Sequence, residues 1–185
     1  MFASKLKNRL KRLRGLAAVR RFCRRDEGAA AVEFSLVMLP FLTLMFVIME
    51  TAVVFFAEQT LETAAADSAR LIMTGQAASQ SFDATAFKNA VCQRIYGLFD
   101  CTNGMYVDVS SNGSSTTFSN SVTYDAQGKP ITSYQPGNPG DYVRVRLIYQ
   151  WPIVVPLVQQ WLVNSGGNTR QLVATIAFKN EPYAN

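Results

Sequence analysis

Residues 24–57 read RRDEGAAAVEFSLVMLPFLTLMFVIMETAVVFFA, and this stretch decides how the rest of the chain is organised. A basic segment ends at Gly28, and an almost uncharged apolar run follows it. Between Phe34 and Ala57 the only charged residue is Glu50. As a helix this run would be about 36 Å long, enough to cross a hydrocarbon core of about 30 Å. We therefore expect a transmembrane helix over residues 29–57.

The charge distribution predicts the orientation of this helix. Ten of the 18 basic residues precede Gly28, and no Lys or Arg follows the apolar run until Arg70. The positive-inside rule then predicts a cytoplasmic N-terminus and an exported remainder, in a bacterium a single-pass inner-membrane protein with a periplasmic domain over residues 58–185. Residues 1–28 carry a net charge of +8 and the rest −3, so the high pI belongs to the leader. Membrane lipids are the expected partner of these basic residues, and nucleic acid is not.

The leader has the character of a segment that is removed. An ordinary secretory signal has an apolar region of 7–15 residues and is cut after it, at small residues. Here the apolar run is longer, and the glycine and small residues stand in front of it. This arrangement favours cleavage between Gly28 and Ala29, although an uncut signal anchor has the same charge pattern.

Three segments together resemble a known family. Gly28–Phe34 (GAAAVEF) is similar to a class III prepilin signal, and the chain more narrowly resembles TadE-like pseudopilins, the minor pilin-like proteins of the tight-adherence (Flp, type IVb) pilus. Residues 64–70, leading to Thr74-Gly75-Gln76, and residues 177–183 agree with this family in order. Phe34 stands where the major Flp pilins usually have tyrosine, and the long cut product also favours a minor subunit.

The resemblance implies a function in pilus assembly. The chain would be cut by a prepilin peptidase and used in assembly or initiation of a Tad/Flp pilus for adhesion. Its partners would be that peptidase, the inner-membrane Tad assembly platform, other TadE/F-like pseudopilins and the Flp pilin, and the subunit could reach the cell surface with the pilus. The competing interpretations are an uncleaved, signal-anchored periplasmic binding or sensor module and an anchored hydrolase without histidine.

Glu33 and Phe34 are the expected assembly and processing residues. A charge within a membrane-length apolar segment is costly and points to a function. Cleavage after Gly28 would create an α-amino group at Ala29 that is cationic near neutral pH, one helical turn from Glu33. We expect Glu33 of one subunit to neutralise the amine of a neighbour; snorkelling to the membrane interface is the alternative.

The cysteines suggest a disulfide in the exported part. Cys23 lies in the leader, which leaves Cys92 and Cys101 in an oxidising compartment. A disulfide between them would contribute roughly 2–3 kcal/mol in the chain-entropy model, and two free buried thiols are the alternative. With no histidine, neither a metal site nor a cofactor is expected, and His-dependent catalytic sites are excluded.

The remaining patterns predict an α+β domain with a pilin-like fold. The long helix should run from residue 29 to residue 74, stop at Gly75 and pack its small-residue face in the core. A second helix over residues 84–99, capped by Asp83, should pack with it on a four-stranded antiparallel sheet. The expected strands cover residues 105–109, 116–124, 141–151 and 169–179, with a short helical piece between Pro156 and Val163.

Three further features, two arginines, an apolar segment and a glutamate, each have two possible interpretations. Arg144 and Arg146 share one strand face, which we interpret as solvated, with an anion site as the alternative. The apolar residues 151–163 are expected to close the core, or else to form a partner surface. Glu50 lies near the outer end of the span, where snorkelling to headgroups is expected and an intersubunit partner is the alternative.

Overall fold

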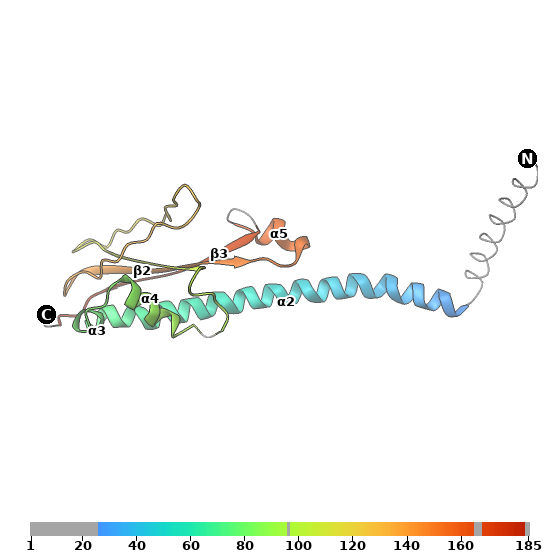
Figure 1. The fold of residues 1–185 in the computed structure, drawn as a ribbon, viewed down its shortest axis with the longest axis horizontal. Helices are drawn as coiled ribbons and strands as arrows, with labels where there is room; N and C mark the ends of the chain where they lie inside the picture. The colour runs from blue at the N-terminus through green and yellow to red at the C-terminus, as the bar shows by residue number, and fades with distance from the viewer. Residues whose placement is uncertain (1–25, 96, 165–167, 184–185) are drawn as a thin grey trace, which may run out of the picture. The chain divides into compact units, whose positions relative to one another are not determined.

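The computed structural model describes residues 26–95, 97–164 and 168–183, so most of the expected leader, including Cys23, lies outside the described residues. The elements in chain order are α2 (Asp26–Met73), α3 (Gln76–Ser79), α4 (Ala84–Cys92), β1 (Met105–Ser111), β2 (Tyr142–Pro152), α5 (Pro156–Leu162) and β3 (Thr169–Lys179) (Figure 1). The chain divides into two compact units, Met1–Ile48 and Met49–Asn185. The α+β class is confirmed.

The long helix ends where the sequence predicts. α2 stops at Met73, and Gly75 follows with φ +76°. Only glycine adopts this left-handed conformation without cost, which is why it so often ends helices. A side chain at this position would also overlap Tyr183, because a Cβ there would lie 2.7 Å from the ring carbons Cδ1 and Cδ2.

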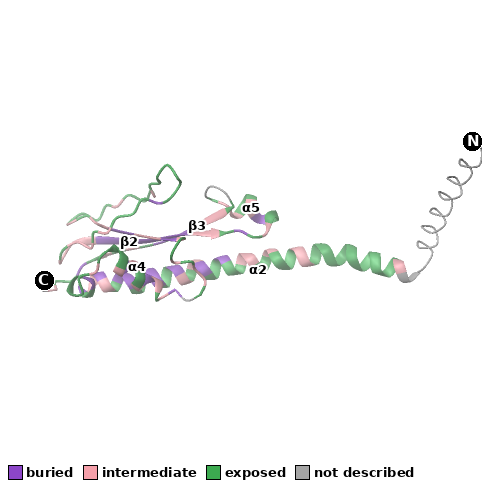
Figure 2. Ribbon diagram, in the orientation of Figure 1, coloured by how far each residue is buried: buried purple, intermediate pink, exposed green. Residues whose placement is uncertain are grey.

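In the second unit, one face of α2 forms the core. Its buried residues recur at three- and four-residue spacing and are mostly small (Figure 2): Val54, Ala57, Leu61, Ala64, Ala65, Ser68, Ala69 and Ile72. Small side chains let neighbouring elements approach the helix closely, while the regular spacing keeps them on one side. The predicted core face is therefore confirmed, although Met73 at its end is only half-buried.

The sheet has three strands where four were expected. Its order is β1-β2-β3, and both pairs are antiparallel. In the register, Val109 lies opposite Val145 on one side, and Val145 lies opposite Ile176 on the other. The central strand β2 is buried on both faces over most of its length, from Val143 to Tyr149.

The expected strand over residues 116–124 is wrong. A later part of the loop between β1 and β2 (residues 112–141) lies along the free edge of β1 instead. The Val109 N–H donates to Ser133 O (2.8 Å), and the Gln135 N–H donates to Val109 O (2.9 Å). These bonds form one isolated bridge between Val109 and Tyr134. With that edge occupied, residues 116–124 cross the outer face of the sheet as irregular chain with a single bridge at Tyr124.

Residues of this loop also bury Arg144 and Arg146, so the solvated-face interpretation is wrong. The two arginines are 8% and 4% exposed. Arg144 donates to the Ser119 carbonyl and pairs with Asp108 at 3.2 Å, while Arg146 donates to the carbonyls of Ser121 (2.9 Å) and Ser119 (2.8 Å). Burial, followed by the neighbouring Arg144 charge, lowers the pKa of Arg146. The two arginines thus bind the loop between β1 and β2 to the sheet.

The second helix is shorter than expected. Asp83 caps α4 as predicted, since its Oδ1 accepts the Ala86 N–H at 2.6 Å. The helix ends at Cys92, however, and the expected continuation to residue 99 is wrong. Gly97 has φ +67°, which is outside the helical region, so a helix that continues to residue 99 is excluded. The disulfide between Cys92 and Cys101 links the end of α4 to the segment that follows.

The buried Asp108–Arg144 pair yields a stability prediction. Asp108→Asn leaves the Arg144 cation without a counter-charge, and breaking a buried pair costs about 3 kcal/mol or more. Glu58→Gln is the matched control, because the Glu58–Arg170 pair is more exposed (29% and 25%, against 13% and 10% for Asp108 and Arg144) and should cost about 1 kcal/mol or less. Urea unfolding of the full chain in detergent measures both, and equal losses would contradict this account.

Candidate functional site

The four residues expected to direct processing and assembly lie in the first turns of α2. Gly28 and Ala29 follow the start of the helix at Asp26, and Glu33 and Phe34 come one turn later. Ala29, Glu33 and Phe34 are exposed, and Phe34 has 65% of its surface open. Because residues four apart share a helix face, Ala29 and Glu33 lie on the same side.

Glu33 is a carboxylate without a partner within the described part of the chain. No hydrogen bond or ion pair joins it to any of these residues. Apolar side chains surround it along the helix, beginning with Val32 and Phe34, which are 54% and 65% exposed. A carboxylate in this setting can accept hydrogen bonds and can neutralise a cation.

The first unit offers an apolar surface for a membrane. From Phe34 to Ile48 no charged residue occurs. The most apolar 18-residue stretch of α2 has none of its residues buried, and the helix is long and apolar enough to span a bilayer. The structure thus has a candidate membrane anchor near its N-terminus. The exposed large side chains of this unit are Val32, Phe34, Leu36, Val37, Met38, Leu39, Phe41, Leu44, Met45, Phe46 and Ile48.

Glu50 has a partner that neither sequence interpretation named. Its carboxylate accepts the backbone N–H of Val154 at 2.6 Å and that of Val155 at 3.0 Å. These two residues join β2 to α5, so Glu50 ties that segment to α2 within the second unit. Hydrogen bonds from two backbone amides stabilise the ionised carboxylate.

A second carboxylate of α2 holds the neighbouring strand. Glu58 Oε1 accepts hydrogen bonds from Arg170 Nη2 at 3.0 Å and from Arg170 Nε at 3.2 Å. Arg170 lies on β3, opposite Trp151 of β2. Glu50 and Glu58 are two helical turns apart, so they contact the domain from the same side of α2.

The disulfide expected from the cysteine count is present. Cys92 at the end of α4 is bonded to Cys101, and their Cα atoms are 5.9 Å apart. The enclosed turn is also attached to the sheet, because the Asp100 N–H donates to the Tyr149 hydroxyl at 3.0 Å. Hydrogen bonds from Asn103 lower the pKa of the adjacent Asp100 carboxyl, which stabilises the ionised form that caps this turn.

A polar cavity of about 740 Å³ lies beside the irregular loop and β2. It is lined by Asn103, Tyr106, Tyr124, Gln127, Gly128, Lys129, Gln150 and Asn164. These groups include no carboxylate and no nucleophile paired with a base, so they do not form a catalytic arrangement of a known kind. Among the described residues no cluster of three metal-ligating side chains occurs either.

The fold and the site together define an α+β domain on a long helix with a candidate membrane anchor. The family model described as TadE-like protein matches residues 28–70, which confirms the resemblance expected from the junction and from the small-residue helix. The expected similarity over residues 177–183 lies outside the matched range. Comparison with curated proteins and with solved structures finds no match to this chain.

The Glu50 contact yields a prediction for local stability. Glu50→Ala removes the acceptor of the Val154 and Val155 amides, so these amides should exchange hydrogen faster. Hydrogen–deuterium exchange followed by mass spectrometry on peptides covering residues 153–162 measures the change. Glu62→Ala is the control, because Glu62 is exposed and its carboxylate accepts only from Gln59 among the described side chains. Equal exchange in the two variants would show that Glu50 does not hold this segment.

Proposed function

We propose that this chain is a minor pilin-like subunit, a pseudopilin, that a prepilin peptidase cuts between Gly28 and Ala29 and that helps to initiate or assemble a Tad/Flp pilus used in adhesion. The observation that carries this proposal is the family match, which begins at Gly28 itself and continues along α2 to Arg70. The matched range thus starts at the proposed cleavage site and covers both the apolar part and the small-residue part of the helix.

The proposed order of events follows from the charge pattern. Residues 1–28 stay in the cytoplasm as a basic leader, residues 29–57 span the inner membrane, and residues 58–185 form the periplasmic domain. After cleavage the domain remains anchored by α2 until it is recruited. The exposed apolar residues of the first unit support the membrane span, and the disulfide suits an oxidising periplasm.

Glu33 would fix how far the helix of one subunit is shifted along the helix of its neighbour. The cut frees an α-amino group at Ala29. Close to lipid both this cation and the Glu33 carboxylate are costly, by at most about 2.5–3.5 kcal/mol, which is the value for a charged side chain at the centre of a span. Pairing the carboxylate of one subunit with the amine of another relieves both costs. The lack of any described partner for Glu33 supports this role.

The partners follow from these steps. The peptidase recognises the junction around Gly28, and the inner-membrane assembly platform receives the cut product. A second TadE/F-like pseudopilin and the Flp pilin present the neighbouring helices against which Glu33 and Phe34 pack. The chemistry of cleavage belongs to the peptidase, and this chain is a substrate and a structural component.

One observation favours the competing uncleaved anchor. α2 begins at Asp26, so the bond between Gly28 and Ala29 lies inside the helix. A peptidase needs an accessible backbone and would have to unwind the first helical turn to cut there. Gly28 lowers the cost of that unwinding, because glycine in a helix is about 1 kcal/mol less favourable than alanine.

A variant of Glu33 tests the assembly role. In cells with the complete pilus machinery, Glu33→Ala should still yield the cut product, because the scissile bond is unchanged. Much less of that product should co-isolate with the other pseudopilins and the sheared fibre fraction, since the freed amine has lost its counter-charge. Glu62→Ala, an exposed glutamate of the same helix, should behave as wild type. Normal incorporation of the Glu33 variant would exclude the proposed role.

A further inference from the structure

The segment around α5 is uncharged and has an exposed apolar side. From Trp151 to Thr169 the chain contains no charged residue. Val154, Leu157 and Trp161 are 78%, 60% and 72% exposed, whereas Ile153 and Val158 are buried. The expectation that residues 151–163 close the core is therefore correct for one side of this segment and wrong for the other.

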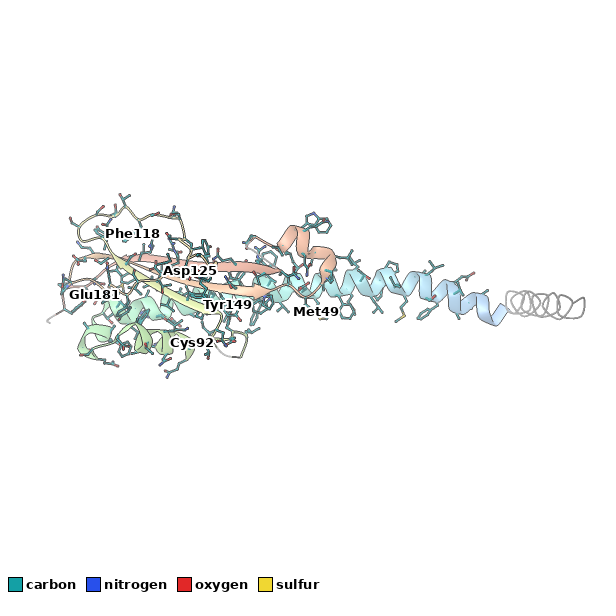
Figure 3. All side chains as sticks on the ribbon, turned by 45° about the horizontal axis from the view of Figure 1, so that its top comes forward. Met49, Cys92, Phe118, Asp125, Tyr149 and Glu181 are labelled. Atoms are coloured by element: carbon teal, nitrogen blue, oxygen red, sulfur yellow. A yellow bond between two sulfur atoms is a disulfide. The ribbon has the colours of Figure 1, made fainter. Side chains whose placement is uncertain are left out.

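Exposed apolar residues of α2 lie close to the start of this segment in the same unit. Figures 1 and 3 show α5 on the same side of α2 as the sheet, and in Figure 3 it lies close to the labelled Met49. The carboxylate of Glu50 holds it there through the amides of Val154 and Val155. Around Glu50 and one turn beyond it, α2 exposes Met49 (55%), Val53 (39%), Phe55 (60%) and Phe56 (61%). Both elements thus expose apolar side chains close to the Glu50 contact.

The position of Glu50 along α2 relates this surface to the bilayer. This step rests on the proposed membrane span over residues 29–57. Counted from Phe34, about 20 helical residues cover a hydrocarbon core of about 30 Å, which ends near Val53. Glu50 lies within one turn of that point, so α5 is held at the outer boundary between acyl chains and headgroups.

The chemistry of the segment fits lipid at this boundary. Tryptophan is enriched there because its ring is apolar while its N–H can bind at the headgroup level. Val154 and Leu157 add side chains that require no directional partner, and the lack of charge removes the main obstacle to insertion. Hydrogen bonds from two backbone amides lower the cost of placing the Glu50 carboxylate near this boundary.

We propose that α5, with Val154, Leu157 and Trp161, inserts into the outer headgroup–acyl boundary of the membrane beside α2. The exported domain is then held to the bilayer at two places, by the spanning helix and by α5, with Glu50 connecting them. This contact has to be released when the subunit leaves the membrane.

Tryptophan fluorescence tests this proposal on the full chain. The protein has two tryptophans, so Trp151→Phe leaves Trp161 as the only one. The variant is placed as a single copy in phosphatidylcholine nanodiscs, with or without lipid brominated on the acyl chain close to the glycerol. Trp161 should emit at shorter wavelength than a tryptophan in water and should lose most of its emission in the brominated discs. Trp161→Phe is the control, because Trp151 is half-buried on β2 and should lose much less.

Each contrary outcome has a distinct meaning. In the first outcome the chain enters the discs, but the emission of Trp161 is unaffected by bromine and is quenched by aqueous iodide. This result overturns the role of α5 and leaves the proposed membrane span intact. Trp161 that is protected from iodide only when several copies share a disc would identify a second subunit as the occupant, which also contradicts the proposal. A chain that does not enter the discs overturns the proposed membrane span together with this inference.

Discussion

The burial of the small-residue face of α2 is the constraint on which the second unit, Met49–Asn185, depends. From Val54 to Ile72 this face is buried at every three or four residues, mostly by alanine and serine side chains that allow close approach. The same helix continues from residues whose large apolar side chains are exposed and are suited to lipid. One continuous helix therefore carries two surfaces, one complementary to protein and one to membrane, and the change between them falls near Glu50.

Two carboxylates of α2 lie near that change, and each accepts hydrogen bonds within the second unit. Glu58 binds Arg170 on β3, and Glu50 binds the amides that precede α5. Both are compensated within the domain, so neither needs a partner from another subunit. Glu33 differs because nothing in the described chain compensates it. The exposed Asp67 of α2 also has no described partner, so the proposed intersubunit role of Glu33 rests in addition on its place beside the apolar run.

Features that depend on near neighbours could be predicted from the sequence. The stop at Gly75, the cap by Asp83 and the strand over residues 169–179 each follow from local pattern, and the structure confirms them. The misses involve distant segments. The loop that replaces the fourth strand is held by Arg144 over 25 residues, and Glu50 meets Val154 over 104 residues. No periodicity or local motif encodes such contacts. For the candidate site, the family resemblance at the junction was enough to select Glu33 and its neighbours. Only the structure shows that Glu50 and Glu58 have hydrogen-bond partners within the described chain while Glu33 has none.

The most direct test of the central claim is the intact mass of the membrane-bound chain, isolated from cells with and without the prepilin peptidase. We expect a product that starts at Ala29 when the peptidase is present and a chain that retains its leader when it is absent. A chain that still starts at Met1 in the presence of the active peptidase would contradict processing and would support a permanent, uncleaved anchor.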